Sequence, residues 1–476
     1  MEKILRFFEK YIIPKFLYRL GQPIYHFKIA FIAAFFYGFP SKKMKVIGVI
    51  GTKGKTTTCN LIAQILNFSG HKTGMATTVN FRIGDREWKN ETKQTMLGRF
   101  QLQKLLGQMV KENCEYAVVE TSSEGILQYR HHFIDYDIAV FTNLSPEHIE
   151  RHGGFENYRS AKVKLFEKVA QEKSGIGIYP HTIMRIVNYI LRRKRKSSFG
   201  VGVYNLDDEN VKYFLKPNIK TKYGFTIKKD KLLSHRIASE EIKDFKEILE
   251  IEDIKFFSDK TEFETNRESA SWRIEMSLVG EFNVYNATAA ICVALSQNIL
   301  MEKIKQALAQ AKPPAGRMEI INKGQDFAVI VDYAHEPASL EAVYTAVSKF
   351  KSLKISKLIC LLGAQGGGRD KWKRPKMGEI AGKYCDEIIL TNEDPYDENP
   401  SQILLDIKSG IMNYELRIKN LYEILDRKEA IKKAISLAKV GDVVILTGKG
   451  GESSMCVENN KKIPWDERKI VEEILK

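Results

Sequence analysis

The stretch that decides the fold is Ile-Gly-Val-Ile-Gly-Thr-Lys-Gly-Lys-Thr-Thr-Thr, residues 47–58, in which an apolar strand runs into a glycine-rich loop that opens a helix. Gly51 and Gly54 allow successive backbone N–H groups to turn inward around phosphate oxygens. Lys55 supplies a mobile cation, and the hydroxyl of Thr56 can hold Mg²⁺. The stretch therefore predicts a site for nucleotide phosphates, made of Gly51, Thr52, Lys53, Gly54, Lys55, Thr56 and Thr57.

The composition is that of a soluble globular enzyme. The chain has 476 residues, of which 43% are hydrophobic and 28% are charged, so it can bury sizeable cores in two or three domains. Lys and Arg exceed Asp and Glu by 75 − 59 = 16. A surplus of this size suggests anionic partners, such as nucleotides, nucleic acid or an acidic membrane surface.

The cysteines are scattered and include no C-x-x-C pair. This spacing predicts reduced thiols in a cytosolic protein and argues against a disulfide framework or a zinc knuckle. The six positions are Cys59, Cys114, Cys292, Cys360, Cys385 and Cys456.

Residues 1–44 form a basic and aromatic segment whose apolar run, residues 24–38, contains Lys28. About 20 apolar residues are needed to span a bilayer, so this run is too short. The nucleotide loop that follows requires cytosolic ATP, which argues against a secretory signal. Two interpretations remain: a helix packed on the catalytic domain, which we favour, and an interfacial helix on anionic lipid. The expected location is the cytoplasm, with attachment to the cytoplasmic face of a membrane as an open alternative.

Hydrophobic periodicity predicts an α/β fold with a P-loop-type central ATPase domain, mostly parallel in its sheet, and a C-terminal Rossmann-like domain. The predicted domains are residues 1–44, 45–312 and 313–476. Residues 200–275 read as shorter strands, and a helix begins after Gly280. The clearest strands are expected at residues 45–51, 116–121, 137–142, 327–333, 358–363, 387–391 and 443–447.

Two polar side chains follow strands that we expect beside the phosphate loop. Glu120 ends one apolar strand, and His148 follows the next in Asn-Leu-Ser-Pro-Glu-His, residues 143–148. Open α/β sheets bind ligands at these strand ends. Glu120 and His148 are therefore candidate Mg²⁺ ligands for a magnesium nucleotide.

From about residue 45 to its end the chain resembles the Mur ligase family, the ATP-dependent amide-bond ligases of peptidoglycan precursor synthesis. It is most similar to the UDP-N-acetylmuramoyl-tripeptide synthetase branch. The matching segments, in the order of the family, begin at the phosphate loop and continue with Glu120-Thr-Ser-Ser, Asn143-Leu-Ser-Pro-Glu-His-Ile-Glu-Arg-His-Gly, Ser160-Ala-Lys-Val-Lys-Leu-Phe, Gly280-Glu-Phe-Asn-Val-Tyr-Asn, Ala315-Gly-Arg-Met-Glu and Val331-Asp-Tyr-Ala-His.

The resemblance implies that a substrate carboxylate attacks the γ-phosphate of ATP and that an amine then displaces phosphate from the acyl phosphate. Lys55, Mg²⁺ and Arg317 would offset the charge on the transferred group. Lys162 matches the lysine that CO₂ converts to a carbamate, an anion able to coordinate Mg²⁺. The implied catalytic set is Lys55, Glu120, His148, Lys162 and Arg317, with Thr56, Glu120, His148 and carbamylated Lys162 on the metal and Asn283, Asn286, Arg317 and Asp332 on ATP.

The resemblance also implies substrate contacts. Ser122, Gln128 and Arg130 match positions that hold the muramoyl-peptide. Arg369 resembles the arginine that grips the carboxylate of the incoming amino acid, and the loop Gly-Lys-Gly-Gly-Glu at 448–452 resembles the one that receives its amine and side chain. The full set of expected substrate residues is Ser122, Gln128, Arg130, His335, Arg369, Asp394, Gly448 and Glu452.

Two departures from the family pattern bear on the substrates. The diaminopimelate-adding branch has Asp-Asn-Pro-Arg where this chain has Glu-Asp-Pro-Tyr, residues 393–396, and Tyr396 cannot form a bidentate ion pair with the distal carboxylate. Asp394 and Glu452 instead favour lysine or ornithine. The family's synthetases also carry an N-terminal domain for UDP, which about 45 residues cannot supply. Either UDP is bound weakly, or the acceptor is presented differently, for example on a lipid carrier.

Other functions stay open at this point. A nucleic-acid-dependent ATPase would explain the phosphate loop and the charge, but it leaves Lys162, Arg317 and the last glycine loop without roles. A membrane-attached interaction protein does not explain the intact ATP residues. Among ligases, the alternative is a folylpolyglutamate, cyanophycin or poly-glutamate type of enzyme. We expect a monomer with no nucleic-acid partner, and the acceptor and a free amino acid as substrates.

Overall fold

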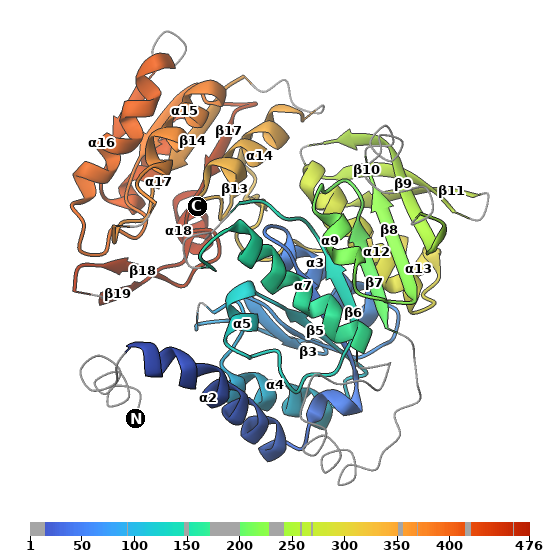
Figure 1. Cartoon of the computed structure of the whole chain (residues 1–476). Coiled ribbons are helices and arrows are strands. Elements are labelled where there is room, and N and C mark those ends of the chain that lie inside the picture. Colours follow the sequence, from blue (N-terminus) through green and yellow to red (C-terminus); the bar gives the residue numbers. More distant parts are fainter. Residues whose placement is uncertain are drawn as a thin grey trace. The chain divides into compact units, whose positions relative to one another are not determined.

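The structure is a computed structural model that describes residues 15–92, 94–146, 152–171, 200–227, 242–257, 259–267, 270–350, 356–368, 370–414, 420–459 and 461–476. The chain forms two compact units (Figure 1). The first comprises Met1–Ile251 and Tyr285–Ala307, and the second comprises Glu252–Val284 and Leu308–Lys476. The domain limits expected at residues 44 and 312 stay predictions.

The first unit is built on a sheet whose strands lie in the order β9-β8-β7-β6-β1-β5-β2-β3-β4. The central strand, β1 (Lys45–Ile50), pairs in parallel with β5 (Tyr116–Glu120) and β6 (Tyr136–Phe141), as expected from their apolar runs. The other strands are β2 (Thr73–Ala76), β3 (Asn80–Ile83), β4 (Arg86–Lys89), β7 (Val201–Asn205), β8 (Thr221–Thr226) and β9 (Phe245–Phe256).

Helices cover this sheet through one large apolar cluster. Leu106 of α4 and Phe166 of α7 belong to the same cluster as Val46 of β1, and all three side chains are buried. Burial of such side chains is the main source of stability for the sheet. The helices described in this part of the chain are α2 (Lys15–Phe36), η1 (Pro40–Lys43), α3 (Lys55–Phe68), α4 (Arg99–Lys111), α5 (Ser123–Leu127), α7 (Phe155–Gln171), α9 (Val211–Leu215), α12 (Glu281–Ser296) and α13 (Met301–Ala309).

Helix α2 packs on the first unit through aromatic side chains. The ring of Phe133 lies 5.2 Å from that of Phe27 and 5.4 Å from that of Phe31, between ring centroids. Ala30 and Ala34 are buried in the same small cluster. Among the described helices, none has the length and apolar character that crossing a membrane requires. Over α2 the chain therefore adopts the packed arrangement that we favoured.

The second unit contains a six-stranded sheet in the order β12-β13-β17-β14-β15-β16. Apart from β12, which is antiparallel, the strands pair in parallel. This is the expected Rossmann-like α/β architecture. The strands are β12 (Glu319–Ile321), β13 (Ala328–Val331), β14 (Leu358–Leu362), β15 (Glu387–Leu390), β16 (Asn420–Glu423) and β17 (Val443–Leu446), with hairpins β10 (Thr261–Arg267)–β11 (Ala270–Met276) and β18 (Ser454–Val457)–β19 (Lys461–Pro464).

Alternate residues of these strands fill two separate cores, as the period of a strand requires. Cys360 and Leu362 of β14 belong to the core that also contains residues of α14, α15 and α16. Ile359 and Leu361 belong to the core that contains residues of α17 and α18. The helices are α14 (Pro337–Ser348), α15 (Lys373–Tyr384), α16 (Pro400–Ile411), η2 (Met412–Tyr414), α17 (Arg427–Leu437) and α18 (Glu467–Ile474).

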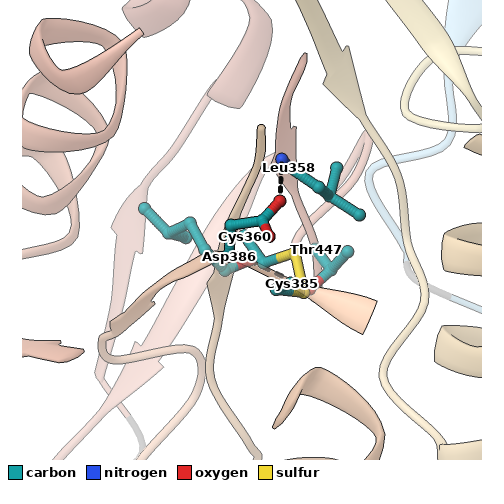
Figure 2. The surroundings of a disulfide bond; sticks show 6 residues. Leu358, Cys360, Cys385, Asp386 and Thr447 are labelled. Atoms are coloured by element: carbon teal, nitrogen blue, oxygen red, sulfur yellow. Dashed lines mark hydrogen bonds between the residues drawn. A yellow bond between two sulfur atoms is a disulfide. The ribbon is translucent and has the colours of Figure 1, made fainter. Parts of the chain in front are cut away.

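A disulfide joins Cys360 of β14 to Cys385, the residue that caps α15 (Figure 2). Beside it, the carboxylate of Asp386 accepts a 2.8 Å hydrogen bond from the backbone N–H of Leu358. The prediction of reduced thiols is wrong for this pair, because the parallel pairing of β14 and β15 brings together two cysteines that are 25 residues apart. Cys59, Cys114, Cys292 and Cys456 are free and buried, as expected.

Candidate active site

The phosphate loop lies between the end of β1 and the start of α3, and only glycine fits at two of its positions. A Cβ atom on Gly51 would lie 1.9 Å from Oγ1 of Thr142. Gly54 has a φ of +81°, and its Cβ would lie 2.2 Å from Oδ1 of Asn286. Other segments of the same chain thus approach the loop backbone closely, which is the arrangement that the glycines predict.

The segment after β6 braces this loop. The backbone N–H of Thr52 donates to the carbonyl of Asn143 (2.9 Å), and that of Lys53 donates to the side-chain oxygen of Asn143 (2.9 Å). The hydroxyl of Thr142 donates to the carbonyl of Lys53 (2.8 Å). Sequence reasoning missed the role of Thr142 and Asn143, although their position directly after a strand was the available signal.

The predicted magnesium residues Thr56 and Glu120 lie together. The hydroxyl of Thr56 donates to Oε2 of Glu120 (2.9 Å). Thr78 also donates to this carboxylate, through its backbone N–H (2.8 Å) and its hydroxyl (3.0 Å), and only 2% of Glu120 is exposed. Lys55 folds back so that Nζ donates to the carbonyl of Thr52 (2.9 Å). Thr78 was not predicted.

Lys162 of α7 is buried against the phosphate loop. Its Nζ donates to the carbonyl of Gly51 (2.6 Å) and lies 4.4 Å from the centre of the Tyr158 ring. The hydroxyl of Tyr158 is 3.1 Å from that of Thr52. Lys162 thus lies at the phosphate loop, while its catalytic role and its carbamylation stay predictions.

The predicted muramoyl-peptide residues surround the short helix α5. Ser122 is its N-cap and accepts a hydrogen bond from the N–H of Gly125 (3.0 Å). Oε1 of Gln128 accepts from Nη2 of Arg130 (2.7 Å), and burial lowers the pKa of Arg130. Two further predicted residues, His148 and Arg369, lie outside the described residues.

In the second unit, Asp332 joins two of the predicted segments. Its carboxylate accepts from the backbone N–H of Met318 and of Ala334, each at 2.7 Å. The guanidinium of Arg317 lies 4.5 Å from the centre of the Tyr333 ring. The loop that carries Arg317 is thereby held beside the strand end that carries Asp332.

Three other predicted residues, His335 from the substrate set and Asn283 and Asn286 from the ATP set, contact neighbouring polar groups. Nδ1 of His335 lies 2.8 Å from the carbonyl oxygen of Tyr333, and the side chain of Asn283 donates to the carbonyl of Val279 (2.8 Å). Asn286, in the first unit, accepts from the hydroxyl of Thr58 (3.3 Å). Each unit thus groups its own share of the predicted ATP residues.

The expected amino-acid loop contains a group of charges that the sequence did not reveal. Nζ of Lys449 donates to Oδ1 of Asp394 (2.8 Å) and also pairs with Glu452. Glu393 is 1% exposed, and burial raises its pKa to about 8. Oε2 of Glu393 would lie 2.8 Å from a Cβ on Gly448, which has a φ of +105°. Asp394 and Glu452 therefore already share an internal cation.

The first unit fits a magnesium nucleotide. A carboxylate and a hydroxyl are oxygen donors of the kind that Mg²⁺ prefers, and the glycine loop leaves no room for side chains. Within the described ranges, no three His, Cys, Asp or Glu side chains gather at one point. Oxygen atoms of the phosphates and water usually complete the coordination of Mg²⁺ at such a site.

These features define the class of the protein as an α/β enzyme with a phosphate loop for a nucleoside triphosphate and a second Rossmann-like unit. Comparison with known families agrees: the Mur ligase middle domain matches residues 49–222 and 183–294, and the Mur ligase glutamate ligase domain matches residues 316–450. The chain belongs to the Mur ligase family. It is an ATP-dependent acid–amino-acid ligase that forms a C–N bond.

Individual relatives cover most of the chain. It is 35% identical over 449 residues to the UDP-N-acetylmuramoyl-L-alanyl-D-glutamate–2,6-diaminopimelate ligase of Syntrophomonas wolfei. This match covers 94% of this chain and 81% of the relative. It is 37% identical to the UDP-N-acetylmuramyl-tripeptide synthetase of Borreliella burgdorferi, with coverages of 92% and 77%. A solved diaminopimelate ligase structure matches with a TM-score of 0.60 and 28% identity over 91% of this chain and 78% of its own.

Proposed function

We propose that the protein adds a diamino acid to UDP-N-acetylmuramoyl-L-alanyl-D-glutamate during peptidoglycan precursor synthesis. The names of the relatives support this pair of substrates. The observation that carries the chemistry is the grouping of Thr56, Glu120 and Lys162 at the phosphate loop, where Lys162 lies 2.6 Å from the carbonyl of Gly51.

In the proposed reaction the acceptor carboxylate attacks the γ-phosphorus of ATP, and ADP leaves. The amine of the incoming amino acid then attacks the acyl carbon, so that a C–N bond forms, the C–O bond to phosphate breaks and the amine loses a proton. Lys55 offsets negative charge on the transferred group, while Thr56 and Glu120 hold the metal. Mg²⁺, when bound, polarises the phosphate oxygens. As a carbamate, Lys162 would add an anionic oxygen ligand.

The added amino acid is a narrower proposal, in which lysine or ornithine is preferred. Among Glu393, Asp394, Glu452 and Lys449, one negative charge remains at pH 7 when Glu393 is neutral, and this surplus suits a side chain with a lone ammonium. Tyr396 offers no cation for a distal carboxylate. Diaminopimelate, which the names of several relatives carry, is the competing outcome.

The test measures phosphate release from ATP and Mg²⁺ with UDP-N-acetylmuramoyl-L-alanyl-D-glutamate, against lysine, ornithine, diaminopimelate and glutamate, with products identified by mass. One new amide with a diamino acid supports the proposal and names the residue. Glutamate as the sole substrate would instead favour the folylpolyglutamate or poly-glutamate type of ligase. Absence of any amide would contradict this acceptor and point to another carboxylate.

We also propose that the outer face of α2 contacts an anionic membrane. Ile24, Ile32, Phe35 and Phe36 are 53–73% exposed and recur at helical spacing with the exposed Lys28 among them. A second copy of the chain on this face would place two like-charged Lys28 side chains against each other. Lipid phosphates would pair with it while the apolar side chains enter the interface.

Vesicle pelleting tests this surface with phosphatidylglycerol and with neutral phosphatidylcholine. The intact chain is expected to pellet with the anionic vesicles, and the double variant Phe35→Ser, Phe36→Ser should remain in the supernatant. Leu300→Ser removes an equally exposed apolar side chain elsewhere and serves as the control. Equal partitioning of the intact chain, the double variant and a form without residues 1–44 would remove the membrane proposal.

A further inference from the structure

Two guanidinium groups of the first unit lie close together and are held by neutral acceptors. Arg99, the first residue of α4, donates to the carbonyl of Gln128 (2.5 Å) and lies 2.5 Å from Nδ1 of His26. Arg130 donates to Oε1 of Gln128 from Nε (3.1 Å) and Nη2 (2.7 Å), and to Gln94 (3.3 Å). Among the described residues, no Asp or Glu forms an ion pair with either arginine.

The electrostatics of this arrangement leave both guanidinium groups without an ion-pair partner among the described residues. Burial, followed by the charge of Arg130, lowers the pKa of Arg99, and Glu124 acts on Arg130 only through space. Nε of Arg99 is buried with no acceptor among the described side chains and backbone. The first turn of α4 carries no acidic residue and its N-cap, Gly98, has no side-chain cap, so the positive end of the helix dipole adds to the field.

A pair of half-buried guanidinium groups is stabilised most by an oxyanion that can accept from both. Binding such an oxyanion requires little rearrangement of the two arginines, because neutral amide and carbonyl oxygens already fix both side chains. The family resemblance gives only Arg130 a role at the acceptor. Arg99 lies in the matched family region, whereas His26 comes from α2, which precedes the matched residues.

We propose that Arg99 and Arg130 together bind a doubly charged oxyanion of the acceptor substrate, and that His26 positions Arg99 for it. The proposal rests on the proposed function for the identity of the acceptor. That acceptor carries two suitable groups, the diphosphate of UDP and the carboxylates of its D-glutamate end. In this way α2 contributes to substrate binding.

His26 acts through Arg99 and does not itself carry charge at neutral pH. Burial and then the charges of Arg99 and Arg130 lower the pKa of His26 to about 4. Its Nδ1 therefore keeps a lone pair that can accept from Arg99. An asparagine places an amide oxygen near the position of Nδ1, so His26→Asn should preserve the contact that His26→Ala removes.

The direct test is calorimetric binding to the full chain saturated with ADP and Mg²⁺, which fills the phosphate loop. The two probes are UDP-N-acetylglucosamine, which has a diphosphate and no carboxylate, and L-alanyl-D-glutamate, which has carboxylates and no phosphate. Arg99→Gln should weaken binding of one probe at least tenfold, and that probe identifies the oxyanion. Lys104→Gln, an exposed charge change on the same helix, should bind as the unaltered chain does.

Kinetic measurements distinguish a positioning role of His26 from a purely structural one. His26→Ala should raise the KM for the acceptor severalfold with kcat and the KM for ATP unchanged, and His26→Asn should restore it. Unaltered binding of both probes by Arg99→Gln, or no binding by the intact chain, would overturn the site. If Arg99→Gln fails to fold, Arg99→Lys replaces it in the test, because lysine keeps the charge and loses the bidentate hydrogen bonding of the guanidinium group. If Arg99→Gln loses binding of a probe while the intact chain forms no amide with any amine, the proposed function is wrong and this binding site still stands.

Discussion

At the scale of single residues, Lys162 is the side chain whose chemistry is least ordinary. Replacing it by alanine should lower the rate of ATP-dependent amide formation by about 10²–10³-fold, because a charge that acts on the transition state is lost. Acetate or formate added to Lys162→Ala should restore part of the rate if a carbamate is the active form. The exposed neighbour Lys164→Ala is the control. Full activity of Lys162→Ala would contradict a catalytic role.

Glu393 gives a prediction for the dependence of stability on pH. Its pKa is raised from 4.5 to about 8 by burial, so the folded chain keeps the proton while the unfolded chain releases it. This contribution to stability is complete below pH 4.5 and is lost as the pH rises toward 8. Glu393→Gln cannot ionise and should therefore gain stability relative to the unaltered protein, by roughly 2–4 kcal/mol at pH 9. Thermal unfolding of both proteins from pH 5 to 9 measures the gap, and a constant gap would refute the shift.

At the scale of elements, the turn from β1 to α3 depends on the absence of a side chain at Gly51. Gly51→Ala should reduce affinity for ATP at least tenfold, since its methyl group would overlap the Thr142 hydroxyl. Calorimetry with ATP checks this. Gly107→Ala, in the middle of α4 where the nearest atom is 3.7 Å away, is the matched control and should bind ATP normally. Its helix should gain up to about 1 kcal/mol.

The disulfide between β14 and the end of α15 ties two elements of the second core. Removing a cross-link that closes 25 residues is expected to cost about 3 kcal/mol, or roughly 6–12 °C in Tm. The double variant Cys360→Ala, Cys385→Ala should have this lower Tm with or without reductant. The unaltered protein should have the lower Tm only when reductant is present. No effect of reductant on the unaltered protein would mean that the bond is absent in solution.

At the scale of the whole molecule, local sequence predicted what depends on local patterns. The apolar runs located β1, β5, β6 and four strands of the second sheet, β13, β14, β15 and β17, to within a few residues, but not β12 or β16. The glycine loop and the end of the strand before Glu120 together predicted that Thr56 and Glu120 lie close to each other. Contacts between distant segments escaped prediction. Lys449 reaches Asp394 across 55 residues, and Thr78 reaches Glu120 across 42, because only the folded sheets bring those strand ends together. The disulfide was missed for the same reason.

The position of β17 within its sheet has a consequence for the synthesis of the chain. β17 lies between β13 and β14, although it follows β14 by some eighty residues along the chain. While the ribosome produces this unit, β13 and β14 cannot become neighbours without blocking the place of a strand that does not yet exist. A nascent chain must therefore keep an open, apolar gap until β17 emerges, and this long-range closure makes folding slow and late. Chaperone engagement before that moment would protect the gap from other chains.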